Sequence, residues 1–452
     1  MNLPDTTDLL LLRPGDAGYA EETAGFQTGF VRRPAVVLGA RSAGDVAAAV
    51  RYAAARDLPL AVQATGHGVP GPLEGGVLVT TRRMDRVTVD PAARTARIEA
   101  GVRWGEVVAA AAPYGLAPPN GSAPSVGAVG YTLGGGLGIL ARAVGHAADR
   151  VRSLDVVTGD GRTHREVREG SELYWGLLGG GPGLGIVTAM EIELVPVGRL
   201  YGGSLAFDGR RVDPAAVLAA YEAWTRTVPD ELTSSFAAVP YPDLPAVPPG
   251  LRGRYVVSVR VAYPGTDGER LVAPLREIGP VPADSLREMP YAESRTIHSD
   301  PEVPHAYYGD SVVLGRLDVD RVAEVLRRTG PAADGTDGTD GTDREDGTAG
   351  ADPMVVVQIN HLGGALARPA PNAVPFREGR FLLRLLTAGD RQRARALLDP
   401  AFARLAPDTL GRAVNFAFGA GDRTEGLHEP GTRKRLAGLR SSYDPANLFR
   451  SV

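Results

Sequence analysis

Three glycine-rich segments constrain this chain more than any other feature of its sequence. They lie at residues 64–68, 117–138 and 179–185. Glycine weakens the interior of a helix or a strand, so runs of it indicate backbone that packs closely against something else. Bare backbone amides can surround a phosphate or lie against a flat ring. The segments therefore predict a site for a planar, phosphorylated cofactor.

His67 lies in the first of these segments, between Gly66 and Gly68, directly after a predicted strand at residues 60–63. The flanking glycines would hold the imidazole at a fixed place with bare backbone on both sides. A lone histidine in a loop is more often a turn residue than a cofactor ligand. From the residues alone, both interpretations stay open.

The order of predicted elements indicates an α+β protein rather than a regular βαβ repeat. Short strands and helices alternate up to residue 198, and the helix that follows Ser42 begins with a capping-box pattern. Beyond residue 200 the pattern predicts a sheet with helices on one face. We expect a first domain at 1–198 with its core at about 30–198, a second domain at 199–405, and a C-terminal segment at 406–452 that returns to the first domain. Residues 331–353 contain few apolar side chains and predict a mobile surface loop.

Several function classes are excluded by composition. The chain has no cysteine, which rules out disulfides, thiolate catalysis and cysteine-ligated metals. Lys434 is the single lysine, which disfavours a P-loop. The net charge of −4 and the absence of a basic stripe predict no nucleic-acid partner. No apolar run approaches the ~20 residues of a membrane span, and the N-terminus has no signal-peptide pattern, so we expect a cytoplasmic protein with no membrane partner.

Common motifs fail when tested. A Rossmann fingerprint would need a third glycine, but Ile139 and Thr188 stand at those places. Walker A and nucleophile-elbow patterns are absent. The seven histidines show no zinc-binding spacing, so no metal site is predicted.

The sequence resembles the FAD-linked oxidoreductases of the vanillyl-alcohol-oxidase superfamily, which have a PCMH-type FAD domain. Within it, the chain is similar to the berberine-bridge-enzyme-like group that includes 6-hydroxynicotine oxidases and sugar oxidases. The matching motifs follow one another along nearly the whole chain: Arg33-Pro34, Gly66-His67-Gly68, Pro124–Gly127, Gly130–Gly138, Asp155–Val157, Gly159–Gly161, Glu172–Trp175, Gly185–Thr188, His361–Gly364 and Tyr443–Phe449.

This resemblance implies an FAD domain of two small α/β subdomains, and a substrate domain whose antiparallel sheet is covered by helices. It implies covalent attachment of FAD to His67. Relatives with a second link use a cysteine where this chain has Ala123, so any link runs through His67 alone. A further departure is Gln63-Ala-Thr-Gly-His67, where relatives commonly have Arg-Ser-Gly-Gly-His. The other implied FAD contacts are Ala64, Thr65, Gly66, Gly68, Val69, Ser122, Ala123, Val126, Gly127, Gly130, Tyr131, Gly134, Gly135, Gly138, Ile186, Val187 and Asn447.

The resemblance implies an oxidase that moves a hydride from a small organic molecule, an alcohol, amine or specialised metabolite, to flavin N5, with O₂ as the final acceptor. A base must then take a proton from the substrate. Strand alternation places Gln358 and Asn360 on one face and His361 on the other; Tyr308 and either His428 or Glu429 are further candidates. A cyclase or isomerase, a flavin-binding protein without turnover, and noncovalent FAD remain alternatives. Oligomeric state is open between monomer and homodimer.

Overall fold

The computed structural model describes residues 9–69, 71–245, 247–331, 355–419 and 424–449. The loop predicted at 331–353 lies almost entirely outside these described residues. Within them, no helix has the length and apolarity that a membrane crossing requires.

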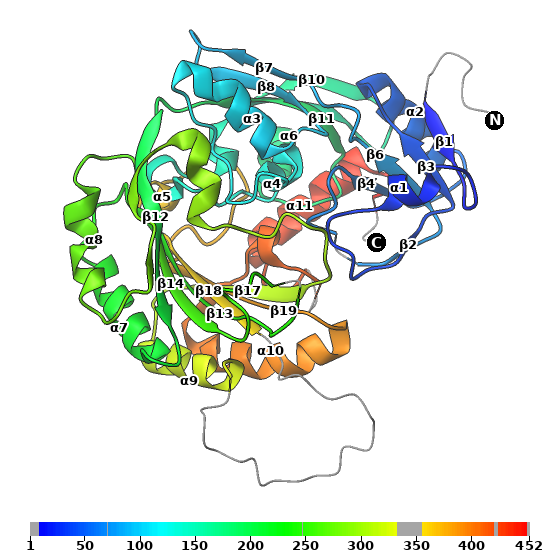
Figure 1. Cartoon of the computed structure of the whole chain (residues 1–452). Helices are drawn as coiled ribbons and strands as arrows, with labels where there is room; N and C mark the ends of the chain where they lie inside the picture. The colour runs from blue at the N-terminus through cyan, green and yellow to red at the C-terminus, as the bar shows by residue number, and fades with distance from the viewer. Residues whose placement is uncertain (1–8, 70, 246, 332–354, 420–423, 450–452) are drawn as a thin grey trace, which may run out of the picture.

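A small mixed sheet begins the fold, in the order β1-β3-β6-β4 (Figure 1). β3 and β4 both pair in parallel with β6, whereas β1 pairs antiparallel with β3. Helix α2 packs on this sheet, and the Ser42 hydroxyl accepts the Asp45 N–H at its first turn, as the capping pattern predicted. The elements are β1 (Leu10–Leu12), α1 (Tyr19–Thr23), β3 (Val36–Gly39), α2 (Ala43–Ala54), β4 (Leu60–Gln63) and β6 (Val77–Thr80), with a two-stranded ladder of β2 (Arg32–Arg33) and β5 (Leu73–Glu74).

A second, antiparallel sheet follows in the order β10-β9-β11-β8-β7. Its buried side chains form one core with the helices around it, centred on Trp104 and Leu154. The glycine-rich segment 117–138 is mostly irregular, but it contains the six-residue helix α4. The elements are β7 (Val87–Asp90), β8 (Thr95–Glu99), α3 (Trp104–Ala111), α4 (Ala128–Leu133), α5 (Ala141–Val144), β9 (Val151–Val157), β10 (Thr163–Val167), α6 (Glu172–Leu177) and β11 (Ile186–Glu193).

The third sheet is nine-stranded and antiparallel, in the order β15-β12-β14-β13-β18-β19-β17-β20, with β16 paired to β12. Figure 1 shows helices α7, α9 and α10 along its outer face, and the two smaller sheets stand on the other side. The strands are β12 (Arg199–Asp208), β13 (Thr233–Pro240), β14 (Tyr255–Tyr263), β15 (Ala283–Asp284), β16 (Arg287–Pro290), β17 (Tyr308–Leu314), β18 (Val355–His361), β19 (Phe381–Thr387) and β20 (Thr409–Gly411). The helices are α7 (Pro214–Thr225), α8 (Gly268–Arg276), α9 (Val319–Thr329) and α10 (Arg391–Leu405).

The two faces of this large sheet differ sharply in polarity. Side chains on the helix side are apolar and buried, and they include Phe236, Val257, Val259, Ile359 and Leu383. Strand alternation sends the intervening residues to the side of the smaller sheets. The helices and the apolar side chains therefore leave one face of the sheet free to form a site.

The C-terminal segment lies against the first part of the chain. Helix α11 (Pro430–Tyr443) passes between the smaller sheets and the large one (Figure 1). The Leu448 carbonyl accepts the N–H of Leu60 at the start of β4, and both oxygens of Asp444 accept N–H groups of the last turn. β20 belongs to this segment by sequence, yet it pairs with β17 of the large sheet. The domain boundaries at 198 and 405 stay a prediction, whereas the α+β class is confirmed.

Candidate active site

A cavity of about 1350 Å³ lies between the large sheet and the smaller ones. The first part of the chain contributes the loop after β4, the segment 121–139 and the segment 180–185. The large sheet contributes one face of β13, β14, β18 and β19, and the chain around α11 closes the rest. All three glycine-rich segments therefore meet at one cavity.

The His67 loop is held by backbone pairing to the segment after α1. Phe26 and Gln27 donate their N–H groups to the carbonyls of Thr65 and Gly66, both at 3.0 Å. Gly66 has φ +72°, and a Cβ there would lie 2.6 Å from the Gly25 Cα. Only glycine fits this close approach. The backbone conformation of the loop at Gly66 is therefore restricted to the one seen here.

One stacked ring and two hydroxyl groups hold the His67 imidazole. The Phe26 ring stacks on it with centroids 3.9 Å apart and planes 11° apart. Its Nδ1 lies 2.9 Å from the Thr65 hydroxyl and its Nε2 lies 3.2 Å from the Ser125 hydroxyl. Burial, together with Arg103 and His305, lowers the pKa of His67 to about 4. The ring is therefore neutral at pH 7.

The Thr65 hydroxyl joins the His67 ring to the segment 121–139. Its oxygen accepts the Gly127 N–H at 3.1 Å and lies 2.9 Å from His67 Nδ1. In the tautomer with the proton on Nε2, the Thr65 hydroxyl donates to Nδ1 and Nε2 donates to the Ser125 hydroxyl.

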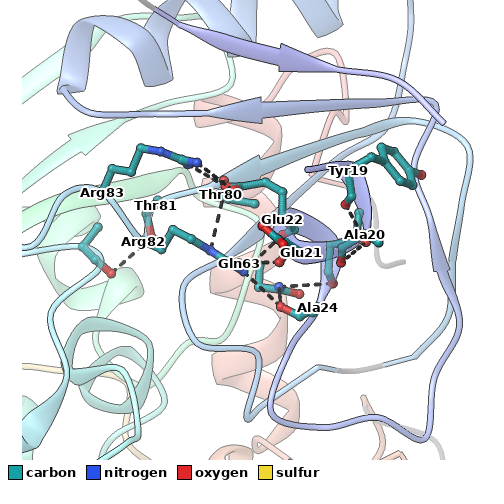
Figure 2. Close-up of polar contacts among 12 residues, drawn as sticks. Tyr19, Ala20, Glu21, Glu22, Ala24, Gln63, Thr80, Thr81, Arg82 and Arg83 are labelled. Carbon is teal, nitrogen blue, oxygen red and sulfur yellow. Dashed lines mark hydrogen bonds and ion pairs between the residues drawn. The ribbon is translucent and has the colours of Figure 1, made fainter. Parts of the chain in front are cut away.

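A polar network anchors α1, and through it the segment that carries Phe26. Figure 2 shows Glu22 between Arg82 and Arg83, with Arg82 reaching the carbonyls of Glu21 and Ala24. Arg83 binds both Glu22 oxygens at 2.7 and 2.8 Å. Burial alone would raise the pKa of Glu22, but the hydrogen bonds from Arg83 and Thr80 hold it below its usual value. Gln63 adds a bond to the Ala24 carbonyl at 3.0 Å. This network therefore holds Ala24 at the end of α1, two residues before Phe26, in place beside the His67 loop.

Two cavity glycines provide a test of whether an FAD molecule fits. A Cβ built on Gly68 or Gly130 meets no protein atom within 4 Å, and both residues line the cavity. Neither has the positive φ that would itself require glycine. The protein's own packing thus gives no reason for bare backbone at these places, whereas a ligand lying against them does. The residues present fit a large planar cofactor.

Most of the FAD contacts implied by the resemblance line this cavity. They are Ala64, Thr65, Gly66, His67, Gly68, Val69, Ser122, Ala123, Val126, Gly127, Gly130, Tyr131, Gly134 and Gly138.

Four expected contacts lie elsewhere. Ile186 and Val187 begin β11, and their side chains are buried in two different hydrophobic cores. Gly135 packs against Val374 rather than facing the cavity. Asn447 is exposed with φ +50° in the C-terminal turn, while Phe449 beside it lines the cavity.

Gln358 and Asn360 face the cavity together, as strand alternation predicts. His361 lies on the other face of β18 and is absent from the cavity wall. It is buried at 2% exposure, stacks near Phe381, and its Nε2 lies 3.2 Å from the Arg142 guanidinium. Burial, Arg142 and Arg380 lower the pKa of His361 to about 3. The structure gives His361 a packing position, so it does not reach a substrate.

The remaining candidate bases are also placed unfavourably. Tyr308 is buried in the core of the large sheet and donates to the Gly29 carbonyl, while its neighbour Tyr307 lines the cavity and donates to the His67 carbonyl at 2.7 Å. Glu429 is exposed at the start of α11 and does not line the cavity. His428 does line it, but its Nε2 is 2.8 Å from the Gly179 carbonyl.

Sequence reasoning missed a charged group on the cavity face of the large sheet. Arg260 and Arg384 project from β14 and β19, and His298 and Asp300 stand beside them. A signal was present: each arginine is the one charged residue in an otherwise apolar strand, Tyr255–Tyr263 and Phe381–Thr387. A lone arginine in such a strand must find a polar site.

Comparisons with known proteins agree with this geometry. A family model described as FAD binding domain matches residues 34–166. The (R)-6-hydroxynicotine oxidase of Paenarthrobacter nicotinovorans is 27% identical, over 97% of this chain and 95% of that protein.

Two solved structures share the whole fold. The 6-hydroxy-D-nicotine oxidase from Arthrobacter nicotinovorans has a TM-score of 0.82 at 24% identity, over 100% of this chain and 98% of that one. A glucooligosaccharide oxidase from Acremonium strictum, described with a 6-S-cysteinyl, 8α-N1-histidyl FAD, has a TM-score of 0.79 at 20% identity, over 98% of this chain and 95% of that one. The predicted resemblance is confirmed: residues 34–166 match an FAD binding domain, and over nearly its whole length the chain is similar to a protein named an oxidase, which supports an FAD-dependent oxidoreductase.

Proposed function

We propose that the chain is an oxidase that holds FAD through a single covalent bond to His67 Nδ1 and transfers a hydride from a small organic substrate, with O₂ as the final acceptor. The observation that carries the proposal is the neutral, stacked imidazole of His67 at the wall of the cavity. The full-length relative is named an oxidase, which supports the same reaction class. The predicted cytoplasmic location rests on the sequence alone.

Attachment at one atom follows from the contacts of the ring. A covalent bond forms through a nitrogen lone pair, and a hydrogen bond donated by the Thr65 hydroxyl would place that lone pair on Nδ1; the hydroxyl must turn away from Nδ1 when the bond forms. Ala123 offers no side-chain nucleophile for a second bond. The loop itself is held by Tyr307, whose hydroxyl binds the His67 carbonyl.

FAD, when bound, would supply the hydride acceptor and pass the electrons to O₂. The bare backbone of Gly68 and Gly130 gives a ring system a flat surface to lie against. The carboxamides of Gln358 and Asn360 stand on the opposite wall, where they can orient a substrate by hydrogen bonds.

His298 is the residue that we assign to the substrate proton. Its Nδ1 is buried, has no hydrogen-bond partner and belongs to a side chain that lines the cavity. Burial, Arg260 and Arg384 lower the pKa of His298 to about 3, while Asp300 opposes them, so the imidazole is neutral at pH 7 and its Nδ1 is open to a hydrogen bond from the substrate. Asp300 is the group that would offset the positive charge on the ring when the proton moves. Gln358 and Asn360 cannot accept that proton, because amides are not bases at that pH.

The experiment begins with the purified protein and its flavin. A yellow protein whose fluorescence stays with the denatured polypeptide, and moves off it in His67→Ala, supports the attachment; a colourless protein that takes up no FAD contradicts the whole proposal. Turnover is then tested with a panel of small alcohols and amines, by anaerobic bleaching of the flavin and by peroxide formation in air. Bleaching without peroxide would make the chain a dehydrogenase instead of an oxidase.

The proton acceptor is tested separately. His298→Gln should slow anaerobic flavin reduction at least tenfold with unchanged flavin content. His428→Gln is the matched control, because its Nε2 already binds the Gly179 carbonyl. Equal slowing in both variants would remove His298 from the mechanism.

A further inference from the structure

The cavity face of the large sheet presents one continuous polar surface. Arg260 stands directly opposite Ser235, which in turn stands opposite Asn360, so three neighbouring strands carry these side chains in one row. In the next row Gln358 stands opposite Arg384. All five line the cavity. The apolar core behind the sheet leaves the two arginines no route to solvent on that side.

Several polar atoms of this surface have no partner in the protein. The Nε of Arg384, the Oδ1 of Asn360 and the Oγ of Ser235 are buried without a hydrogen bond. The Arg384 guanidinium carbon lies 4.2 Å from the centre of the Phe416 ring, a contact that gives the Nε no hydrogen-bond partner. A buried polar atom without a partner is unfavourable, so these atoms indicate contacts made to a ligand.

The charges at this surface do not balance. Burial lowers the pKa of Arg384 to about 10, and it also lowers the pKa of Arg260, but both remain protonated at pH 7. Asp300 is the one acidic residue among the described residues that line the cavity. Burial alone would raise its pKa, but the Ser122 hydroxyl, Arg260 and Arg384 hold it below its usual value. One carboxylate therefore faces two guanidinium groups, with His298 neutral beside them.

We infer that Arg384 and Arg260 form a subsite for a carboxylate group of the substrate. A single negative charge would balance the surplus positive charge, and a carboxylate matches the planar fork of a guanidinium with two parallel hydrogen bonds. The Ser235 hydroxyl can donate a further hydrogen bond to it. The phosphates of FAD have other candidate partners, because Arg433 and Arg440 line the cavity from α11. The inference rests on the proposed function, since it makes the large sheet the substrate-binding wall of the same site.

The test measures binding of simple probes to the purified protein by calorimetry at fixed chloride concentration. Benzoate and propionate are compared with benzamide, a neutral molecule of the same shape as benzoate. We expect benzoate to bind at least tenfold more tightly than benzamide. Arg384→Gln should weaken benzoate at least tenfold and change benzamide less than twofold, and Arg384→Lys should restore part of the loss. Arg260→Gln should act in the same direction.

Arg391→Gln is the matched control, because it removes an arginine that lines the same cavity from α10 and has no assigned role. The inference is overturned if neither carboxylate binds more tightly than benzamide, if inorganic phosphate binds more tightly than both, or if Arg391→Gln weakens benzoate as much as Arg384→Gln does. Flavin content is measured on every sample. Loss of flavin in Arg384→Gln would assign that arginine to the cofactor and also overturn the inference. A wild-type protein without flavin that still discriminates benzoate from benzamide would contradict the proposed function and leave the subsite standing.

Discussion

Phe26 lies flat on the imidazole of His67, with ring centroids 3.9 Å apart and planes 11° apart. The two residues come from different segments, which the backbone bonds from Phe26 and Gln27 to the His67 loop hold together. The Glu22 network in Figure 2 anchors the first of these segments to β6 and the turn after it. The stack therefore couples the N-terminal segment to the residue that we propose for flavin attachment.

Removing the stacked ring should slow flavin attachment. An aromatic pair contributes roughly 0.5–1.5 kcal/mol beyond its buried area, so Phe26→Leu should reduce the attachment rate by about 2- to 12-fold. The rate is measured by adding FAD to flavin-free protein and following the fluorescence of the denatured polypeptide with time. Phe30→Leu is the control, since Phe30 also lines the cavity but contacts Tyr308 instead. Equal rates in wild type and Phe26→Leu would show that the stack has no part in attachment.

Thr65 should matter through its hydroxyl and not through its shape. Thr65→Val leaves the Gly127 N–H without its acceptor and removes the donor to His67 Nδ1. We expect a loss of about 1 kcal/mol in the free energy of unfolding and a slower attachment of FAD. Thr65→Ser, which keeps the hydroxyl, should recover the attachment rate. Attachment in the valine variant at the wild-type rate would contradict the tautomer assignment.

Alanine substitution at two glycines of the cavity should affect different properties: stability at Gly66 and FAD binding at Gly130. Gly66→Ala places a Cβ 2.6 Å from the Gly25 Cα at a φ of +72°, which should destabilise the fold by about 1–2 kcal/mol or more. Gly130→Ala lies in α4 with no protein atom near its Cβ, so thermal stability of the flavin-free protein should not fall. Its Cβ should instead weaken FAD binding, measured by titration of flavin-free protein. FAD binding unchanged by Gly130→Ala would argue against FAD lying on that surface.

His361 should make stability depend on pH without affecting the reaction. Its pKa is about 3 in the fold and near 6.5 in an unfolded chain. Between these values only the unfolded chain binds the proton, so stability falls as the pH is lowered from about 6.5 toward 3, by up to roughly 1.4 kcal/mol per pH unit. Above pH 6.5 neither state is protonated and the contribution is constant. His361→Gln should flatten the dependence by about one proton in urea unfolding measured from pH 8 to 4, while flavin reduction is retained. A variant that cannot reduce its flavin would return His361 to the list of catalytic residues.

Local patterns in the sequence predicted the elements that carry the site. The strand at 60–63 has the bounds that apolar patterning indicates. Ser42 caps the helix that its position predicts. The face of Gln358 and Asn360 followed from alternation alone, because alternation within a strand is fixed by backbone geometry.

Contacts between distant segments could not be predicted in this way. Nothing local in the sequence pairs Phe26 with His67, or Ser122 with Asp300, because each pair is brought together by the packing of separate elements. The chemistry of His361 makes it a candidate base, but alternation along β18 puts it on the face away from the cavity that Gln358 and Asn360 line. Arg260 and Arg384 acquire a joint meaning only when the strand order sets them on one surface.

The most direct test of the account is the intact mass of the denatured protein after expression with its native flavin. We predict that the wild-type polypeptide carries the added mass of one FAD and that His67→Ala has the mass of the polypeptide alone. Ala123→Ser serves as a control and should keep the added mass. A wild-type polypeptide without added mass, or an His67→Ala polypeptide that retains it, would contradict attachment through His67.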